Sequence, residues 1–251
     1  MNNGKTFHFS GDGTVTSTEG NARERGKKFV LDSSSVITIS DNCLIKVMRH
    51  LSDAEKISFM IPESVYEESV ERPLRIKRFE LNAIRIRDAV NEGYISVSRT
   101  TPGVKRRLAE LDAITRSLCT VNGKPTQIVQ LGESETLALV KETGADCLVI
   151  DERTTRMLVE DPEDLFAFLQ RRLEGKVTIN PGAVKRFRQL YGDVKIVRSV
   201  ELIALAYEDG SLDSEVSRSR QALEAALYAA KFAGCAVSFD EIQRYMREMN
   251  K

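Results

Sequence analysis

The chain has 251 residues, with 37 Lys and Arg against 37 Asp and Glu, and therefore no formal net charge. This length suits one large domain or two small ones, and a content of 41% hydrophobic and 29% charged residues indicates a globular protein and excludes a disordered chain. The neutral balance excludes a generally basic, histone-like nucleic-acid binder, but not an enzyme whose positive and negative residues are segregated.

Residues 1–27 are rich in Gly, Ser, Thr and Asn, which predicts a flexible tail or a small hairpin. They lack the apolar core of a secretory signal, and no later run approaches the roughly 20 apolar residues that cross a bilayer. We therefore expect a cytoplasmic protein without membrane contact. The four cysteines lie far apart and are expected to be reduced thiols. With only two histidines, a zinc site or a histidine-dependent centre is not expected, so any chemistry would depend on carboxylates.

From Lys28 onward, short apolar runs alternate with helical patterns such as residues 79–90. The expected strands are residues 29–31, 57–61, 94–97, 147–150 and 194–197. Short buried strands that alternate with helices predict βαβ units. The sequence therefore predicts an α/β fold, a three-layer α/β/α sandwich with a mainly parallel central sheet.

We expect residues 28–210 to form this α/β domain, with a helical insertion at about 158–192 where the alternation breaks. Residues 211–251 predict a helical C-terminal extension, because an apolar stripe ends at Gly234 and Ser238 and Glu241 have capping-box spacing. This extension could pack on the domain or on a partner.

Acidic residues fall where the expected strands end or where the adjoining helices begin: Asp32, Glu63, Glu67, Glu68, Glu133, Glu135, Asp151 and Glu152. In a parallel α/β sheet, ligands gather beyond the carboxyl ends of the strands. Carboxylates that converge there would repel one another unless a hard cation neutralised them, and their oxygens suit Mg²⁺ or Mn²⁺. Each acid alone has a simpler explanation, since acids in the first turn of a helix complement its dipole and Asp32 could cap the next helix.

Four blocks of the sequence resemble the PIN-domain family of metal-dependent ribonucleases. Phe29-Val-Leu-Asp32 resembles the opening strand with the first metal ligand. Pro62-x-x-Val65-x-x-Glu68 resembles the second block and places its ligand on Glu68.

The third and fourth blocks are Gly132-Glu133-Ser-Glu135, which resembles a Gly-Glu-x-Glu block, and Asp151-Glu152-Arg153, which resembles an Asp-Asp-Arg block. Glu152 stands where many relatives have Asp, so either residue of that pair could be the ligand. Glu133 is favoured over Glu135.

The resemblance implies a PIN-like fold and a metal-dependent endoribonuclease that hydrolyses RNA phosphodiester bonds with Mg²⁺ or Mn²⁺. It implies Asp32, Glu68, Glu133 and Asp151 as catalytic carboxylates, with Glu135 and Glu152 as further metal ligands. Ser33, Ser34 and Arg153 would contact the phosphate or a ligand carboxylate.

Two stretches, residues 72–87 and 171–188, each hold six cations and one acid, and a third basic cluster begins at Lys105. Such patches suit a phosphate backbone, although charged helix faces are usually just solvated. The expected RNA contacts are Arg75, Lys77, Arg78, Arg85, Lys105, Arg106 and Arg107.

A haloacid-dehalogenase-type phosphatase needs a second acid two residues after the first, where this chain has Ser34, and a nucleotide-binding fold needs a glycine-rich turn that is missing after Asp32. The remaining alternative is a catalytically inactive PIN-like scaffold that binds RNA or a protein partner. The Ala-rich stretch at 220–233 could pack on a partner or on a second copy in a homodimer.

Overall fold

Five parallel strands form the central sheet of the computed structural model, which describes residues 5–9, 15–19 and 26–249. Their order is β10-β8-β3-β4-β5, and every pairing among them is parallel. The strands are β3 (Lys27–Leu31), β4 (Ile57–Pro62), β5 (Ile95–Ser98), β8 (Cys147–Val149) and β10 (Ile196–Val197). Each end lies within two residues of the expected strand, which confirms the α/β class and the parallel sheet.

Hydrophobic cores lie on both faces of this sheet, which explains why the central strands β3 and β8 contain continuous apolar runs. In β3, Phe29 and Leu31 belong to one hydrophobic core and Val30 belongs to the other. Cys147 and Leu148 of β8 are divided between the two cores in the same way. The arrangement is consistent with three α/β/α layers.

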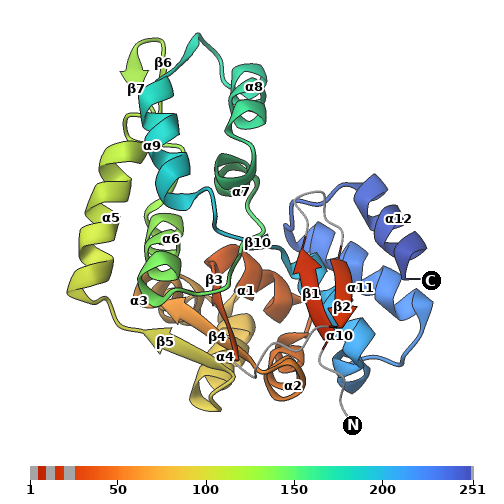
Figure 1. Ribbon diagram of the computed structural model, residues 1–251. Coiled ribbons are helices and arrows are strands. Elements are labelled where there is room, and N and C mark those ends of the chain that lie inside the picture. Colours follow the sequence, from red (N-terminus) through yellow and green to blue (C-terminus); the bar gives the residue numbers. More distant parts are fainter. Residues whose placement is uncertain (1–4, 10–14, 20–25, 250–251) are drawn as a thin grey trace.

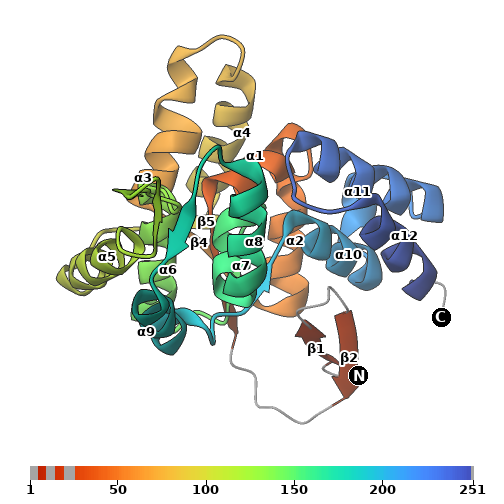
Figure 2. The ribbon, with the colours of Figure 1, turned by 90° about the horizontal axis from the view of Figure 1, so that it is seen from above.

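One core is covered by helices from both ends of the chain (Figures 1 and 2): α1 (Ser33–Asp41), α2 (Ile45–Glu55), α4 (Glu80–Asn91), α10 (Ser199–Asp209), α11 (Arg220–Ala233) and α12 (Phe239–Glu248). The other core lies under five helices: α5 (Pro102–Thr115), α6 (Leu131–Thr143), α7 (Arg153–Glu160), α8 (Pro162–Arg172) and α9 (Pro181–Tyr191). The short turns α3 (Glu63–Tyr66), η1 (Glu67–Glu71), η2 (Pro73–Arg75) and η3 (Ser211–Ser214) complete the helices.

The stretch expected as a helical insertion contains α8 and α9, but also a strand, β9 (Val177–Ile179). This strand pairs antiparallel with β6 (Cys119–Val121), which also pairs with β7 (Lys124–Pro125). The sequence did not indicate this strand, because a three-residue strand whose partner is far away in sequence leaves no local periodic signal.

The C-terminal extension packs on the α/β domain. Leu223 and Leu227 of α11 and Met246 of α12 are buried in the same core as α1 and α10. At the start of α10, the buried Arg198 donates hydrogen bonds to Glu201 and Glu241. These contacts join α12 to the edge of the central sheet.

Much of the segment 1–27, expected to be a tail or hairpin, lies outside the described residues. Within it, β1 (Lys5–Phe9) and β2 (Val15–Glu19) pair as antiparallel strands. Across the ranges that the structure describes, none of the helices has the length and apolar character to span a membrane.

Candidate functional site

The order of the strands defines where a ligand site is expected. From β3 the chain builds outward to β4 and β5, and it then returns to the other side of β3 to add β8 and β10. The carboxyl ends of β3 and β8 therefore mark the switch point of the sheet, which is the usual ligand position in open α/β folds. Asp32 follows β3 directly, and the Asp151-Glu152 pair comes just after β8.

Asp32 is a buried carboxylate with one unpaired oxygen. It is 2% exposed, and its Oδ2 accepts hydrogen bonds from the backbone N–H of Ser34 (3.1 Å) and from the Ser34 hydroxyl (2.9 Å). Its Oδ1 is buried and accepts no hydrogen bond. Burial raises the pKa of Asp32 to about 6 against the opposing hydrogen bonds from Ser34, and the negative charge of Glu68 adds to the increase.

Glu133, in the first turn of α6, is the second buried carboxylate. Its Oε2 accepts from the Thr155 hydroxyl (2.6 Å) and from the backbone N–H of Gln130 (2.9 Å), so Glu133 also caps α6. Burial, together with the charges of Glu152 and Asp32, raises the pKa of Glu133 to about 7 against the opposing hydrogen bonds from Thr155 and Gln130. The two buried acids therefore act on each other electrostatically.

Glu68 approaches the same place from the π-helical turn η1. A Cβ added to Gly132, at the start of α6, would lie 3.3 Å from Oε2 of Glu68. The missing side chain of Gly132 thus leaves room for Glu68 beside the first turn of α6, which carries Glu133. Glu68 itself is exposed, so this carboxylate faces solvent at the rim of the buried pair.

The Asp151-Glu152 pair is divided between two roles. Glu152 caps α7, where it accepts from the backbone N–H groups of Thr154 and Thr155 at 2.7 Å each, and its charge acts on Glu133. Asp151 was expected as a catalytic carboxylate and metal ligand. In the structure Asp151 is fully buried, and Ser199 donates hydrogen bonds to both of its oxygens. The physical reason is that the N-terminus of α10 offers an N–H group and a favourable dipole for this carboxylate.

Glu135 lies on the β5 side of the site rather than beside Asp32. Its Oε1 is 2.7 Å from the hydroxyl of Thr100, and the backbone N–H of Thr100 donates to Glu63 (3.0 Å). The hydrogen bonds from Thr100 lower the pKa of Glu63, and the positive charge of Lys105 contributes. Glu63, Glu135 and Thr100 thus form a second polar cluster at the same sheet edge.

The predicted phosphate-contacting residues differ in their surroundings. The Ser34 hydroxyl donates to Asp32 and accepts from the backbone N–H of Asp151 (3.1 Å), so it orients a carboxylate. Ser33 begins α1, and its backbone N–H also favours the ionised form of Asp32. The Arg153 guanidinium lies 5.6 Å from the centre of the Phe168 ring, so it stacks on an aromatic side chain.

Four of the seven predicted RNA contacts are engaged by protein groups: Lys77 by Glu80 (2.9 Å), Arg78 by the Phe79 ring (5.4 Å), Arg85 by Asn82 (3.1 Å) and Arg107 by Glu142 (2.7 Å). Arg75, Lys105 and Arg106 are exposed and form no ion pair within the described ranges. Lys105 is the one whose charge acts on an acid of the sheet edge.

The carboxylates of Asp32, Glu68 and Glu133 meet some of the requirements of a site for a hard cation. The orphaned Oδ1 of Asp32 and the like charges around it are the features that a cation would compensate. As the side chains stand, however, no three Asp, Glu, His or Cys residues in the described part of the chain come together closely enough to hold a metal ion. The sequence did not reveal Thr155, which donates a hydrogen bond to Glu133, or Thr100, which donates one to Glu135. A lone threonine in a first helical turn or shortly after a strand carries no distinctive sequence signal.

Comparison of the chain with family models, with curated proteins and with solved structures finds no match. The class of this protein is therefore described by its fold and site. It is an α/β protein with buried carboxylates beyond the carboxyl edge of a parallel sheet.

Proposed function

We propose that the protein is a metal-dependent endoribonuclease of the PIN type, in which Asp32, Glu68 and Glu133 form the catalytic carboxylate cluster. The observation that carries this proposal is the surroundings of the Asp32 carboxylate. It is buried at the switch point of the sheet, its Oδ1 accepts no hydrogen bond, and the charges of Glu68 and Glu133 interact with it. An unpaired buried carboxylate is unfavourable for folding, and such strained titratable groups concentrate at functional sites.

Mg²⁺ or Mn²⁺ would be held by Asp32, Glu68 and Glu133, and would supply Lewis acidity and an activated water for attack on a phosphodiester. The protein's own contribution is orientation. Ser34 fixes one oxygen of Asp32, and Thr155 fixes one oxygen of Glu133, so the orientation of each carboxylate is restricted before the substrate binds.

The RNA backbone would enter over the start of α5. Lys105 and Arg106 are exposed there, next to the Thr100 cluster that joins β5 to α6. Unpaired cations at this edge suit phosphate groups that approach the carboxylates. We expect the four engaged cations of the predicted set to contribute less.

The alternative function is a catalytically inactive scaffold that binds RNA or a protein partner in the cytoplasm. Two observations favour it: Asp151 is satisfied by Ser199, and no three potential ligands gather closely within the residues described. Under this reading, the acids at the sheet edge would bind no catalytic ion.

A cleavage assay separates the two functions. The full chain is incubated with labelled single-stranded RNAs of mixed sequence in Mn²⁺, Mg²⁺ or EDTA, beside Asp32→Asn, Glu133→Gln and the control Asp53→Asn. Asp53 is an exposed acid on α2. We expect metal-dependent cleavage that falls about 100-fold or more in the two site variants and is unchanged in the control. Cleavage that persists in EDTA or in Asp32→Asn contradicts the proposal, whereas RNA binding without cleavage by any of the proteins supports the scaffold.

A further inference from the structure

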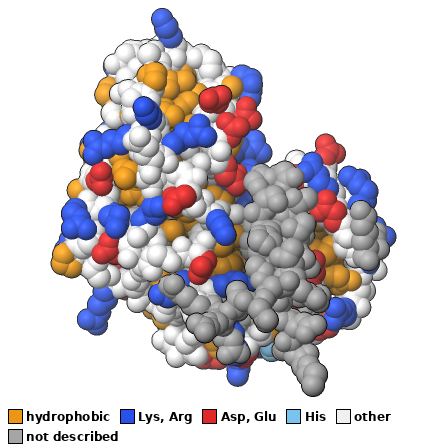
Figure 3. Space-filling model, in the orientation of Figure 1, with side chains coloured by type: hydrophobic (Ala, Val, Ile, Leu, Met, Phe, Trp, Pro, Cys, Tyr) orange, Lys and Arg blue, Asp and Glu red, His pale blue; other side chains and the backbone are white. Residues whose placement is uncertain are grey.

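A groove of about 870 Å³ lies between α8, β9 and α9, and none of the carboxylates of the candidate site lines it. Its volume is within the roughly 300–1,000 Å³ typical of small-molecule sites. Figure 3 shows hydrophobic side chains gathered over this upper part of the molecule, with Lys and Arg side chains around them. The groove is therefore a separate feature that the proposed nuclease chemistry does not use.

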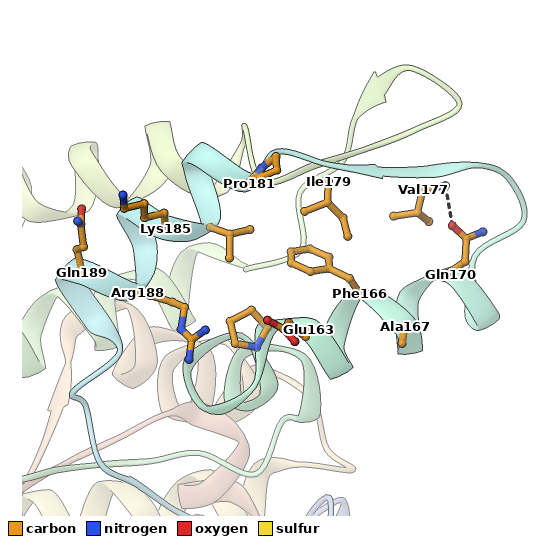
Figure 4. Close-up of a pocket in the computed structure, with 12 residues that line it drawn as sticks. Glu163, Phe166, Ala167, Gln170, Val177, Ile179, Pro181, Lys185, Arg188 and Gln189 are labelled. Carbon is orange, nitrogen blue, oxygen red and sulfur yellow. Dashed lines mark hydrogen bonds between the residues drawn. The ribbon is translucent and has the colours of Figure 1, made fainter.

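One end of the groove is apolar. Phe166 and Ala167 of α8 face Val177 and Ile179, which occupy alternate positions on β9 (Figure 4). Gln170 also lies here, but its amide accepts from the backbone N–H of Val177 (3.2 Å) and donates to the carbonyl of Gly175 (3.1 Å). Its polar atoms are thus already satisfied, and this end offers a surface for a hydrocarbon.

The other end carries positive charge. Lys185 and Arg188 are exposed one turn apart on α9, and neither forms an ion pair with any residue that the structure describes. Figure 4 shows both at the α9 end, away from Val177 and Ala167. Glu163 of α8 is the acid that lines the groove, so two cations face one carboxylate.

We propose that this groove binds a free single-chain amphiphile with an anionic headgroup, namely a long-chain alkyl carboxylate. The carboxylate would lie between Lys185 and Arg188, and the chain would run along Phe166 towards Ile179 and Val177. The lengthwise separation of charge from apolar surface favours this occupant. A docked amphipathic helix would instead favour charges distributed along both rims, whereas the end of the groove near Val177 has no charged lining residue.

The test is calorimetric titration of the full chain with sodium dodecanoate below its micelle concentration, in parallel with dodecyltrimethylammonium and with acetate. The double variant Lys185→Glu/Arg188→Glu removes the contacts with the headgroup. Ala167→Trp fills the apolar end from an exposed position of α8. The matched charge control, Lys124→Glu/Arg171→Glu, changes two exposed cations outside the groove.

We expect saturable binding of one dodecanoate per chain, with an affinity that is unchanged in the control variant and about tenfold weaker or worse in both groove variants. The parent protein should bind the cationic amphiphile about tenfold more weakly or worse than dodecanoate, and it should show no detectable binding of acetate. Equal affinity for the two amphiphiles, or unchanged binding by Lys185→Glu/Arg188→Glu, overturns the proposal. Binding to phosphatidylglycerol vesicles without binding of monomeric dodecanoate also overturns it, because that result indicates a membrane surface. Circular dichroism of each variant confirms that it is folded.

Discussion

Asp151 and Ser199 are joined by two hydrogen bonds, from the Ser199 backbone N–H to Oδ1 (2.8 Å) and from the Ser199 hydroxyl to Oδ2 (2.7 Å) of Asp151. The pair connects the end of β8 to the first turn of α10. The carbonyl of Asp151 also accepts from the backbone N–H of Ala236 (3.0 Å), and burial, with the charge of Asp151 beside it, raises the pKa of the Cys235 thiol. Asp151 thus connects the sheet to the C-terminal extension.

Asp151→Asn should therefore lower stability rather than metal affinity. The amide NH₂ of asparagine would face a donor of Ser199, so one buried hydrogen bond is lost, at about 2 kcal/mol of the free energy of unfolding. Urea unfolding measures this loss, and Asp53→Asn should change stability by less than about 0.5 kcal/mol. If Asp151→Asn left the free energy of unfolding unchanged but abolished the stabilisation of the protein by added Mn²⁺, Asp151 would instead be a metal ligand.

Glu133 and Asp32 should give the metal-free protein a distinct pH dependence. Their folded pKa values of about 7 and about 6 lie above the ordinary values of 4.5 and 3.8, so the folded protein retains protons that the unfolded chain has already lost. The stability that these two groups contribute is full below the ordinary values and is lost as the pH rises through the folded values.

Glu133→Gln stays neutral at every pH and isolates this effect. Relative to the parent in EDTA, we expect it to be on the order of 3 kcal/mol more stable near pH 8 and equally stable near pH 4. Urea unfolding across this pH range measures the difference. A difference that does not grow with pH contradicts the raised pKa.

Added Mn²⁺ should stabilise the folded protein, because a cation that binds the carboxylate cluster binds the folded state alone. At about 100 times the dissociation constant, the gain is about 2.7 kcal/mol, or roughly 5–10 °C in Tm for a chain of this size. Asp32→Asn and Glu68→Gln should abolish the shift, and Asp53→Asn should retain it. An equal shift in all four proteins would assign the metal to another place.

Gly132→Ala tests the position of Glu68 separately. The added Cβ would lie 3.3 Å from Oε2 of Glu68, so this carboxylate has to move by a few tenths of an ångström. Alanine is the better helix former, so stability should not fall, whereas the affinity for Mn²⁺ should drop several-fold, as read from the concentration dependence of Tm. Unchanged affinity would place Glu68 outside the metal site.

The sequence predicted the central strands β3 and β8 because they are buried on both faces, so each is visible as a continuous apolar run without knowledge of its neighbours. The strands β6 and β9 carried no such signal. Cys119-Thr-Val and Val177-Thr-Ile are three residues long, and β9 is half exposed, so only their mutual pairing makes them strands.

The candidate site was predictable to the same extent. Asp32 follows a strand whose end was clear, and Glu133 begins a helix next to it. The hydrogen bonds of Asp151 come from Ser199, which is 48 residues further along the chain and has no local relation to the Asp151-Glu152 pair. The surroundings of Asp151 thus depend on a tertiary contact that the local sequence does not show.

Arg198 should be a sensitive position, because it joins the start of α10 to α12. Its guanidinium is 4% exposed and contacts Glu201 (2.6 Å) and Glu241 (2.9 Å), so Arg198→Ala would leave the buried Glu201 carboxylate without its cation. We expect a loss of about 3–5 kcal/mol, measured by urea unfolding, together with faster proteolysis of α12. The control is Arg218→Ala, which breaks a solvent-exposed pair with Asp213 (3.6 Å) and should cost less than about 1 kcal/mol. Equal losses in the two variants would show that the buried network does not hold the extension in place.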